Sequence, residues 1–201
     1  MMLFLALLVS YLLGAIPTAY LLVKWAKGID IRTMGSGNVG ATNALRTVGL
    51  WAGVVVLAID VLKGIIAAWL IPRWLLGETT PDRSLVCGLA AVLGHDFPCF
   101  LRFRGGKGVA TTIGVLVGSV PLVAGIVVGV WLVVFGLFRY VSLGSIAAAV
   151  AIPLSQLALH QSRREILIGS GLAILIIARH RANISRLLSG AEHRIWPRQG
   201  D

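Results

Sequence analysis

The sequence predicts an all-α integral membrane protein with seven transmembrane helices. Of its 201 residues, 57% are apolar, and the mean hydropathy is +0.89, well above the values of a soluble domain. Long apolar segments follow one another along the chain, and basic residues gather in alternate loops between them. Because a helix needs about 20 apolar residues to cross about 30 Å of hydrocarbon, most of the chain is expected to lie in lipid.

Seven apolar segments are the predicted spans. They cover residues 2–23, 50–71, 84–101, 108–120, 121–138, 141–159 and 165–178. The first segment has no basic residues before its apolar run and is too long for a cleaved signal peptide, so it is expected to remain as a helix. No repeat and no Ser-rich or Pro-rich linker divides the chain, which predicts a single domain over residues 1–201.

The stretch over residues 108–138 fits either one kinked helix or two helices that meet near Pro121, and the basic residues favour two. Seven spans place 13 of the 18 Lys and Arg on one side and 4 on the other, with Lys63 inside a span, whereas six spans divide them 9 to 8. The positive-inside rule then makes the N-terminus periplasmic and the C-terminus cytoplasmic. Arg163 and Arg164 lie on the wrong side in this topology, and the sequence assigns them no role.

The first polar cluster is GSGNVGATNALR, residues 35–46. Its glycines spell G-x-G-x-x-G, and the stretch also approaches the nucleotide loop G-x-x-x-x-G-K-[ST], with Ala41 in place of the lysine. Both motifs need a preceding strand in an α/β unit, whereas a membrane helix precedes this one, so nucleotide binding is not expected. The remaining alternatives are a flexible glycine turn between helices and a site for another anion.

Residues 35–46 have the composition of an oxyanion site. Glycines tolerate positive φ and let backbone N–H groups turn toward one anion, and Arg46 adds a guanidinium suited to phosphate. The predicted phosphate-binding residues of this segment are Ser36, Gly37, Asn38, Gly40, Thr42 and Asn43.

The segment GGKG, residues 105–108, is predicted to supply the lysine that the first cluster lacks. Lys107 stands among Gly105, Gly106 and Gly108 at the start of a helix, where N–H groups and the helix dipole favour an anion. The neighbouring Arg102 and Arg104 are instead expected to be membrane-surface anchors, worth about 1 kcal/mol each on anionic lipid.

Further polar residues flank the last two spans. His180 and Asn183 lie three positions apart and therefore share a helix face. Ser142 and Ser145 open the sixth span, where a serine is commonly a helix cap, so a substrate contact competes with that simpler reading.

Asp60 and Lys63 lie three apart inside the second span, where charges are costly and face a partner or a polar cavity. A structural ion pair explains them equally well. With His95, Glu192 and His193, they are expected to support the site rather than to react. The pattern of residues predicts no metal site and no cofactor.

Five motifs, in their order and spacing, resemble the bacterial acyl-phosphate:glycerol-3-phosphate acyltransferases across nearly the whole chain. They are GSGNVGATNALR, DVLKG, GHDFPCFLRFRGGKGVAT, RYVSLGSI and RHRANISRLLSGAEHR. The resemblance implies a seven-helix enzyme of the bacterial inner membrane with its active site toward the cytoplasm. Its reaction would move a fatty acyl group from acyl phosphate to the 1-hydroxyl of glycerol 3-phosphate, giving lysophosphatidic acid and phosphate, the first step of phospholipid synthesis.

The resemblance also implies roles for individual residues. The phosphate-binding glycine loop falls on Ser36 to Asn43, and one of Ser142 and Ser145 contacts substrate. The expected catalytic residues are Lys107, Arg46, His180 and Asn183. Membrane lipid and the two phosphate-bearing substrates are the expected partners, and nucleic acid is not.

The expected chemistry is direct attack by the acceptor hydroxyl. An acyl phosphate is an activated anhydride, so positioning and charge stabilisation suffice without a covalent acyl-enzyme. The base is either His180, by its ordinary pKa, or a phosphate oxygen of a bound substrate. Another class of glycerol-phosphate acyltransferases carries H-x-x-x-x-D, and none of the four histidines here has an aspartate five positions later.

Two other functions compete, a transporter of an organic phosphate and a passive lipid-binding protein. Broken helices and anion-binding loops do occur in transporters. The crowding of the polar clusters on one predicted face, with only Asp60 and Lys63 near the midplane, counts against transport.

Overall fold

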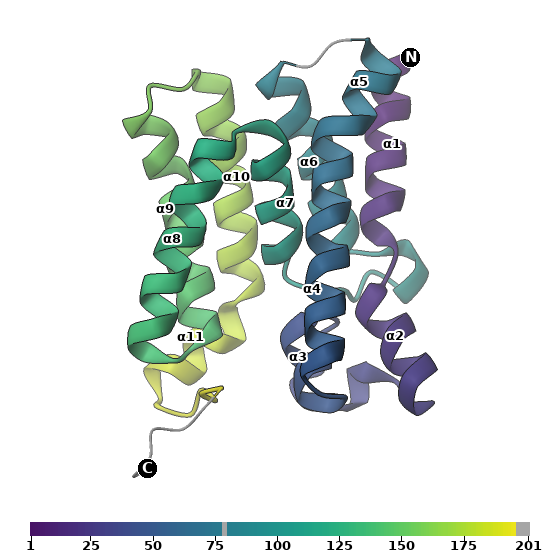
Figure 1. The fold of residues 1–201 in the computed structure, drawn as a ribbon, viewed down its shortest axis with the longest axis vertical. Helices are drawn as coiled ribbons and strands as arrows, with labels where there is room; N and C mark the ends of the chain where they lie inside the picture. Colours follow the sequence, from purple (N-terminus) through teal and green to yellow (C-terminus); the bar gives the residue numbers. More distant parts are fainter. Residues whose placement is uncertain (78–79, 196–201) are drawn as a thin grey trace. The chain divides into compact units, whose positions relative to one another are not determined.

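The computed structural model describes residues 1–77 and 80–195, and all regular structure in these two ranges is helical (Figure 1). The helices form two compact units, unit 1 from Met1 to Val120 and unit 2 from Pro121 to Asp201. The expectation of one domain over residues 1–201 stays a prediction, and each unit is described by itself.

Unit 1 holds seven α-helices, two short 3₁₀ turns (η1 and η3) and one π-helical segment (η2) within its described residues. In chain order these are α1 (Met2–Ala15), α2 (Thr18–Lys27), η1 (Ile31–Thr33), α3 (Ala41–Thr47), α4 (Leu50–Ile65), η2 (Ile66–Leu70), α5 (Ile71–Leu76), α6 (Pro81–Asp96), η3 (Cys99–Leu101) and α7 (Val109–Ser119). Unit 2 holds α8 (Pro121–Phe138), α9 (Val141–Ala158), α10 (Arg163–Arg179) and α11 (Arg181–Leu188).

Five helical stretches among the described residues are long and apolar enough to cross a membrane. They are Met2–Lys27, Leu50–Leu76, Pro81–Leu101, Pro121–Phe138 and Val141–Ala158. The other two predicted spans correspond to α7, whose 11 residues rise only about 16 Å, and to the 17-residue α10. Seven crossings therefore stay a prediction.

Two of the predicted spans are wrong as single helices, because each is interrupted just before a proline. The span over 2–23 breaks at Ile16, before Pro17, and the span over 84–101 breaks at Phe97, before Pro98. Both residues leave the helical region, with ψ of 113° and 61°, as expected where the proline ring crowds the preceding residue. Val120 does the same before Pro121, so residues 108–138 form two helices and not one.

Close helix crossings in unit 1 depend on glycine. A Cβ at Gly64 of α4 would overlap the carbonyl oxygen of Thr111 in α7, and a Cβ at Gly114 of α7 would overlap that of Val61 in α4. Small residues at such crossings let helix backbones approach and gain packing energy where lipid offers no hydrophobic driving force. The α4–α7 pair is therefore held at a separation that only glycine permits.

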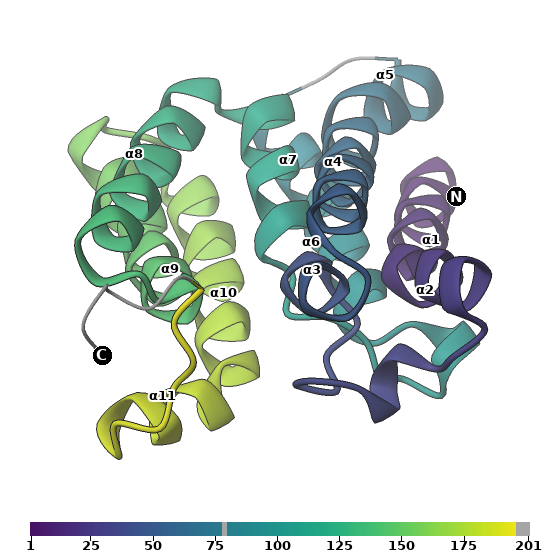
Figure 2. The same cartoon turned by 60° about the horizontal axis from the view of Figure 1, so that its bottom comes forward.

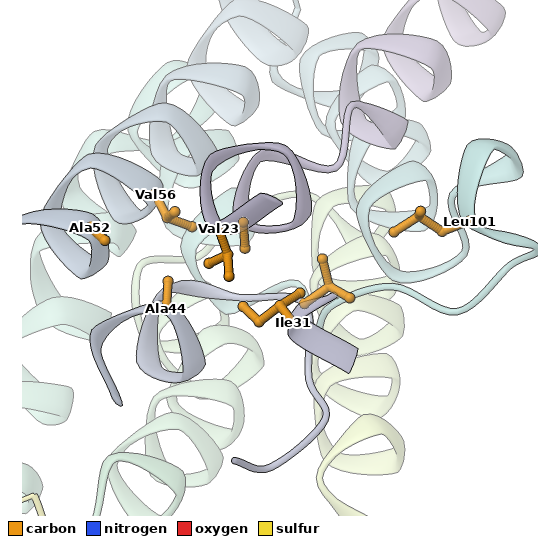
Figure 3. Packing of buried hydrophobic residues seen from close by; sticks show 8 residues of the cluster. Val23, Ile31, Ala44, Ala52, Val56 and Leu101 are labelled. Atoms are coloured by element: carbon orange, nitrogen blue, oxygen red, sulfur yellow. The ribbon is translucent and has the colours of Figure 1, made fainter. Parts of the chain in front are cut away.

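A buried apolar cluster fixes the segment between α2 and α4. Figure 3 shows Val23, Ile31 and Ala44 packed with residues of α4 and η3. The whole cluster is Ala19, Val23, Ile31, Val39, Ala44, Ala52, Val56 and Leu101. Figure 2 shows α2 and α3 beside α4, in agreement with their contacts. The polar segment 35–46 is thus attached to a packed core at both of its ends.

Candidate active site

The side chain of Asn43 organises the glycine loop of residues 35–40. Its Nδ2 donates to the carbonyl oxygens of Met34 (3.0 Å), Asn38 (3.0 Å) and Ile31 (3.2 Å), and its Oδ1 accepts from the N–H of Ser36 (3.1 Å). Asn43 is 1% exposed. Its amide therefore bonds to the loop backbone, and a contact of Asn43 with a ligand stays a prediction.

Two backbone amides of the glycine loop are bonded within the loop itself. Gly35 and Gly37 do adopt positive φ, 55° and 68°. However, the N–H of Ser36 donates to Asn43, and that of Gly37 donates to Met34 O at 2.9 Å. These two amides satisfy the turn itself, and the segment carries side-chain donors in addition.

Those side-chain donors lie on the loop and on α3. Ser36 is exposed, Asn38 and Thr42 are half-buried, and Arg46 is exposed. Thr42 and Arg46 lie four residues apart on α3 and so share one of its faces. Gly40 precedes the helix as its N-cap with an extended backbone, φ −155°.

The loop 105–108 is bonded to the end of α6. The N–H of Gly105 donates to Asp96 O (3.2 Å) and that of Gly106 to His95 O (3.0 Å). Gly108 has a φ of 72° and is the N-cap of α7, a left-handed position that glycine adopts without strain. Lys107 lies half-buried between these anchors.

The structure brings these two polar segments of unit 1 together. Val39 of the glycine loop and Gly105 line one small cavity of about 10 Å³, together with His95, Pro98 and residues 14–18 of the α1–α2 break. Leu101, between α6 and the loop 105–108, packs in the same cluster as Ile31 and Val39. The predicted proximity of the glycine loop to the lysine loop is therefore supported at the level of the backbone.

Asp60 and Lys63 form a buried ion pair with Oδ1–Nζ at 2.8 Å, and the two residues are 2% and 3% exposed. Lys63 Nζ also donates to the carbonyl oxygens of Ile16 (2.9 Å) and Gly14 (3.3 Å) at the C-terminal end of α1, where cations are favoured. His95 Nδ1 lies 3.8 Å from Asp60 Oδ1. The two charges are therefore paired, and their role in the reaction stays a prediction.

An apolar groove of about 360 Å³ opens beside the α1–α2 break. Ile16, Pro17, Tyr20 and Leu21 form one wall, and Phe100 and Leu101 form the other. Ile16 and Pro17 also line the small cavity that reaches His95 and Gly105.

In unit 2, Glu192 is the centre of a polar cluster. Its Oε1 accepts from Asn183 Nδ2 (2.6 Å) and Ser142 Oγ (2.8 Å), and its Oε2 accepts from Arg186 Nε (2.7 Å). Burial alone would raise the pKa of Glu192, but the hydrogen bonds from Asn183, Ser142 and Arg186 outweigh it and hold the pKa below its usual value. The supporting role expected of Glu192 agrees with this geometry, whereas His193 is exposed.

The two serines of α9 are not helix caps. Tyr140 is the N-cap and makes no side-chain cap bond. Ser142 donates to Glu192, whereas Ser145 donates to the carbonyl oxygen of Val141 (2.8 Å) and accepts from Trp131 Nε1 (3.4 Å). Only Ser142 is therefore joined to the cluster that contains Asn183.

His180 is held by a backbone carbonyl. The sequence offered no carboxylate to orient this ring, but its Nδ1 lies 2.8 Å from Ile176 O, and the residue is 3% exposed. Since a carbonyl oxygen only accepts, Nδ1 must carry the proton, which makes Nε2 the basic nitrogen of the neutral ring. The ring stands at the junction of α10 and α11, with Asn183 one turn further along.

Sequence reasoning missed two residues that shape these segments. Arg186 completes the Glu192 cluster, and its place inside the motif RHRANISRLLSGAEHR was the available signal. Asp30 accepts from the N–H of Arg32 (2.9 Å) and from its guanidinium (2.6 Å), and these bonds hold the pKa of Asp30 below its usual range. The Asp30–Arg32 pair orders the turn that leads into the glycine loop.

Comparison with known proteins gives consistent matches. The glycerol-3-phosphate acyltransferase family model matches residues 4–190. A glycerol-3-phosphate acyltransferase of Thermoanaerobacter pseudethanolicus is 45% identical, over 94% of this chain and 93% of the relative. Glycerol-3-phosphate acyltransferase 2 of Moorella thermoacetica is 46% identical, over 96% of this chain and 98% of the relative.

Solved structures give the same result. The crystal structure of PlsY (YgiH), an integral membrane glycerol 3-phosphate acyltransferase, in its glycerol 3-phosphate form, is 41% identical to this chain, with a TM-score of 0.90 and 96% of each chain covered. Its lysophosphatidic acid form gives a TM-score of 0.86, with 96% of this chain and 95% of that chain covered. The chain is an integral membrane protein and belongs to the glycerol-3-phosphate acyltransferase family.

Proposed function

We propose that this protein transfers a fatty acyl group from acyl phosphate to the 1-hydroxyl of glycerol 3-phosphate, producing lysophosphatidic acid and inorganic phosphate for phospholipid synthesis. The observation that carries the proposal is its 41% identity, over 96% of the chain, to a protein whose structures are described in glycerol 3-phosphate and lysophosphatidic acid forms. The matched family is one of acyltransferases, which counts against the two alternatives of transport and passive lipid binding.

Both substrates carry a phosphate, and the donors of unit 1 suit such groups. Lys107 supplies a compact positive charge, while Arg46 supplies a planar guanidinium that binds phosphate oxygens in pairs. The hydroxyls of Ser36 and Thr42 and the amide of Asn38 add neutral donors on the same segment. Preorganised donors of this kind stabilise charge that develops on the phosphate and the carbonyl oxygen.

The acceptor hydroxyl attacks the acyl carbonyl carbon directly in this proposal. A bond forms from that oxygen to the carbonyl carbon, the anhydride bond to phosphate breaks, and inorganic phosphate leaves with the bonding pair. The proton of the hydroxyl passes to a phosphate oxygen of a bound substrate. His180 is the competing acceptor through Nε2, and an unchanged pH–rate profile in His180→Gln would exclude it.

The apolar groove between Ile16 and Phe100 fits the acyl chain of the donor. Its walls are mainly apolar side chains, and it shares Ile16 and Pro17 with the cavity that Gly105 lines. An acyl chain held there would keep its apolar surface away from water.

The roles of the unit 2 residues follow from the family resemblance. Asn183 and Ser142 are bonded to one carboxylate oxygen of Glu192, so their side chains are fixed in direction. We propose that His180 and Asn183 contribute to the same reaction and that Ser142, rather than Ser145, is the serine that serves it.

The proposed topology has seven crossings, with the N-terminus in the periplasm and the C-terminus in the cytoplasm of a bacterial inner membrane. The distribution of 13 basic residues against 4 supports this orientation. The active site then faces the cytoplasm.

The test uses protein purified in detergent, because a transporter has no activity without two compartments. We expect phosphate release from palmitoyl phosphate that depends strictly on added glycerol 3-phosphate, with lysophosphatidic acid as the lipid product. A metal chelator is expected to leave the rate unchanged. Equal activity with acyl coenzyme A would contradict the proposed donor, and phosphate release without glycerol 3-phosphate would contradict acyl transfer.

A further inference from the structure

The imidazole of His95 joins the buried charges of unit 1 to the lysine loop. On one side, Nδ1 lies 3.8 Å from Asp60 Oδ1, whose carboxylate is paired with Lys63. That pair is immobilised in turn, because Lys63 Nζ donates to two backbone carbonyls at the end of α1. The His95 side chain is 9% exposed and so is enclosed by protein.

On its other side, the ring lies directly against Gly106. A Cβ at Gly106 would overlap Nε2, and the next nearest atoms are two ring carbons of the same imidazole. The N–H of Gly106 also donates to the backbone oxygen of His95. His95 therefore contacts the residue before Lys107 through both its side chain and its main chain.

His95 also lines the cavity that Val39 and Gly105 line. Thr18 lines this cavity as well and is 8% exposed. His95 thus lies where the α1–α2 break, the glycine loop and the lysine loop meet, all within unit 1.

We propose that His95 is a positioning residue for acyl transfer. Its imidazole, held beside the rigid Asp60–Lys63 pair, is the wall against which Gly106 packs, and it sets the backbone position from which Lys107 reaches phosphate. The proposal rests on the proposed function for its assay. A displacement of about 1 Å at a group far from the reacting atoms is enough to slow a reaction about a hundredfold.

The first experiment is a double-mutant cycle between the ring and the glycine. His95→Ala and Gly106→Ala are each expected to lower kcat/KM for glycerol 3-phosphate by about ten- to a hundredfold. In the double variant, the new methyl group enters the space that the ring has left. The double variant is therefore expected to fall within about threefold of His95→Ala alone. A loss equal to the product of the two single losses, or wild-type kinetics in both single variants, would overturn the proposal.

A second arm separates the two sides of the ring. The amide of His95→Gln reaches as far as Nε2 and still meets Gly106, whereas that of His95→Asn ends near the place of Nδ1. Gln is expected to retain more activity than Asn, and the reverse order would contradict the packing role. These two variants and Gly106→Ala keep the test decisive if His95→Ala does not fold.

A third arm shows whether His95 acts through the lysine. In a Lys107→Ala background, His95→Ala is expected to lower turnover by less than about threefold more, an outcome that a general loss of stability would not give. Gly125→Ala is the matched control expected to keep wild-type kinetics, since no atom lies within 4 Å of a Cβ at Gly125. An inactive wild-type protein would refute the function, whereas an active wild type with additive losses would refute the role of His95 alone.

Discussion

Lys107 is the residue with the clearest expected effect on the rate. Lys107 follows Gly106 and precedes Gly108, the N-cap of α7, and its proposed role is to stabilise charge on the transferring phosphate. Lys107→Ala is expected to lower turnover about a hundredfold, or about 3 kcal/mol of transition-state stabilisation. Lys107→Arg is expected to rescue poorly, because a planar fork does not replace a compact charge. Steady-state rates with palmitoyl phosphate measure both effects.

The matched control for Lys107 is Arg104→Ala. Arg104 is an exposed cation three residues away, and its φ is not positive, whereas Arg102 has a left-handed backbone that a substitution would disturb. Turnover of Arg104→Ala is expected to stay within about threefold of wild type. Normal turnover in folded Lys107→Ala, with a large loss in Arg104→Ala, would reverse the assignment of site and anchor.

The hydrogen bonds to the Glu192 carboxylate predict that the stability of the protein depends on pH. The folded pKa of Glu192 lies below its ordinary value of 4.5, so its stabilising effect is complete above about pH 4.5 and disappears as the pH falls through the folded pKa. Glu192→Gln is expected to lower the free energy of unfolding by about 1–3 kcal/mol at pH 7, because charge-assisted bonds are lost. The difference between the two proteins should disappear as the pH falls through the folded pKa of Glu192. Thermal unfolding in detergent across this range measures it, and a constant difference would contradict the cluster.

The sequence predicted which residues belong to the candidate site, but it predicted only part of what each residue contacts. The sequence indicated Ser36, Asn43 and Lys107 by composition and spacing. It did not show that the Asn43 amide bonds to its own loop, because that depends on where the carbonyls of Met34 and Asn38 point after folding. Contacts across long sequence separations, such as Lys63 with Ile16 O, were equally hidden.

At the scale of the helices, Gly114 is expected to be essential for the α4–α7 crossing. Gly114→Ala places a methyl group on the carbonyl oxygen of Val61, and overpacking of this kind costs about 1–3 kcal/mol. The midpoint of thermal unfolding should fall. Gly129→Ala in α8 is the control, since no atom lies within 4 Å of a Cβ built at Gly129. An equal fall of the unfolding midpoint in that variant would show that any replacement of a helical glycine lowers stability, and would contradict the role of the α4–α7 crossing.

Hydropathy predicted where the helices lie, but it did not predict where they are interrupted. A proline is a poor guide to these interruptions, because only some prolines end a helix. Ile16 and Phe97 leave the helix before a proline, yet Pro153 lies inside α9 without ending it. The π-helical segment Ile66–Leu70 directly precedes α5, where Pro72 has no N–H to donate to an earlier carbonyl. Whether a proline ends, widens or merely enters a helix depends on neighbouring helices, which periodicity does not reveal.

For the whole molecule, the number of membrane crossings depends on whether α7 spans the membrane. Its 11 residues rise about 16 Å, roughly half of the hydrocarbon thickness. If α7 and α8 both cross, the loop near residue 30 and the C-terminus share one side of the membrane. If α7 does not cross, they lie on opposite sides. The count of 13 basic residues against 4 favours the first arrangement.

Reporters inserted at residue 30, at residue 160 and after residue 201 test this topology. A reporter that works only in the cytoplasm is expected to be active at 30 and 201 and inactive at 160, because residue 160 lies between α9 and α10, on the side with few basic residues. A reporter that works only in the periplasm should give the opposite pattern. Activity at residue 30 without activity at residue 201 would show that the chain crosses the membrane an odd number of times after residue 30, and the seven-helix topology would then be wrong.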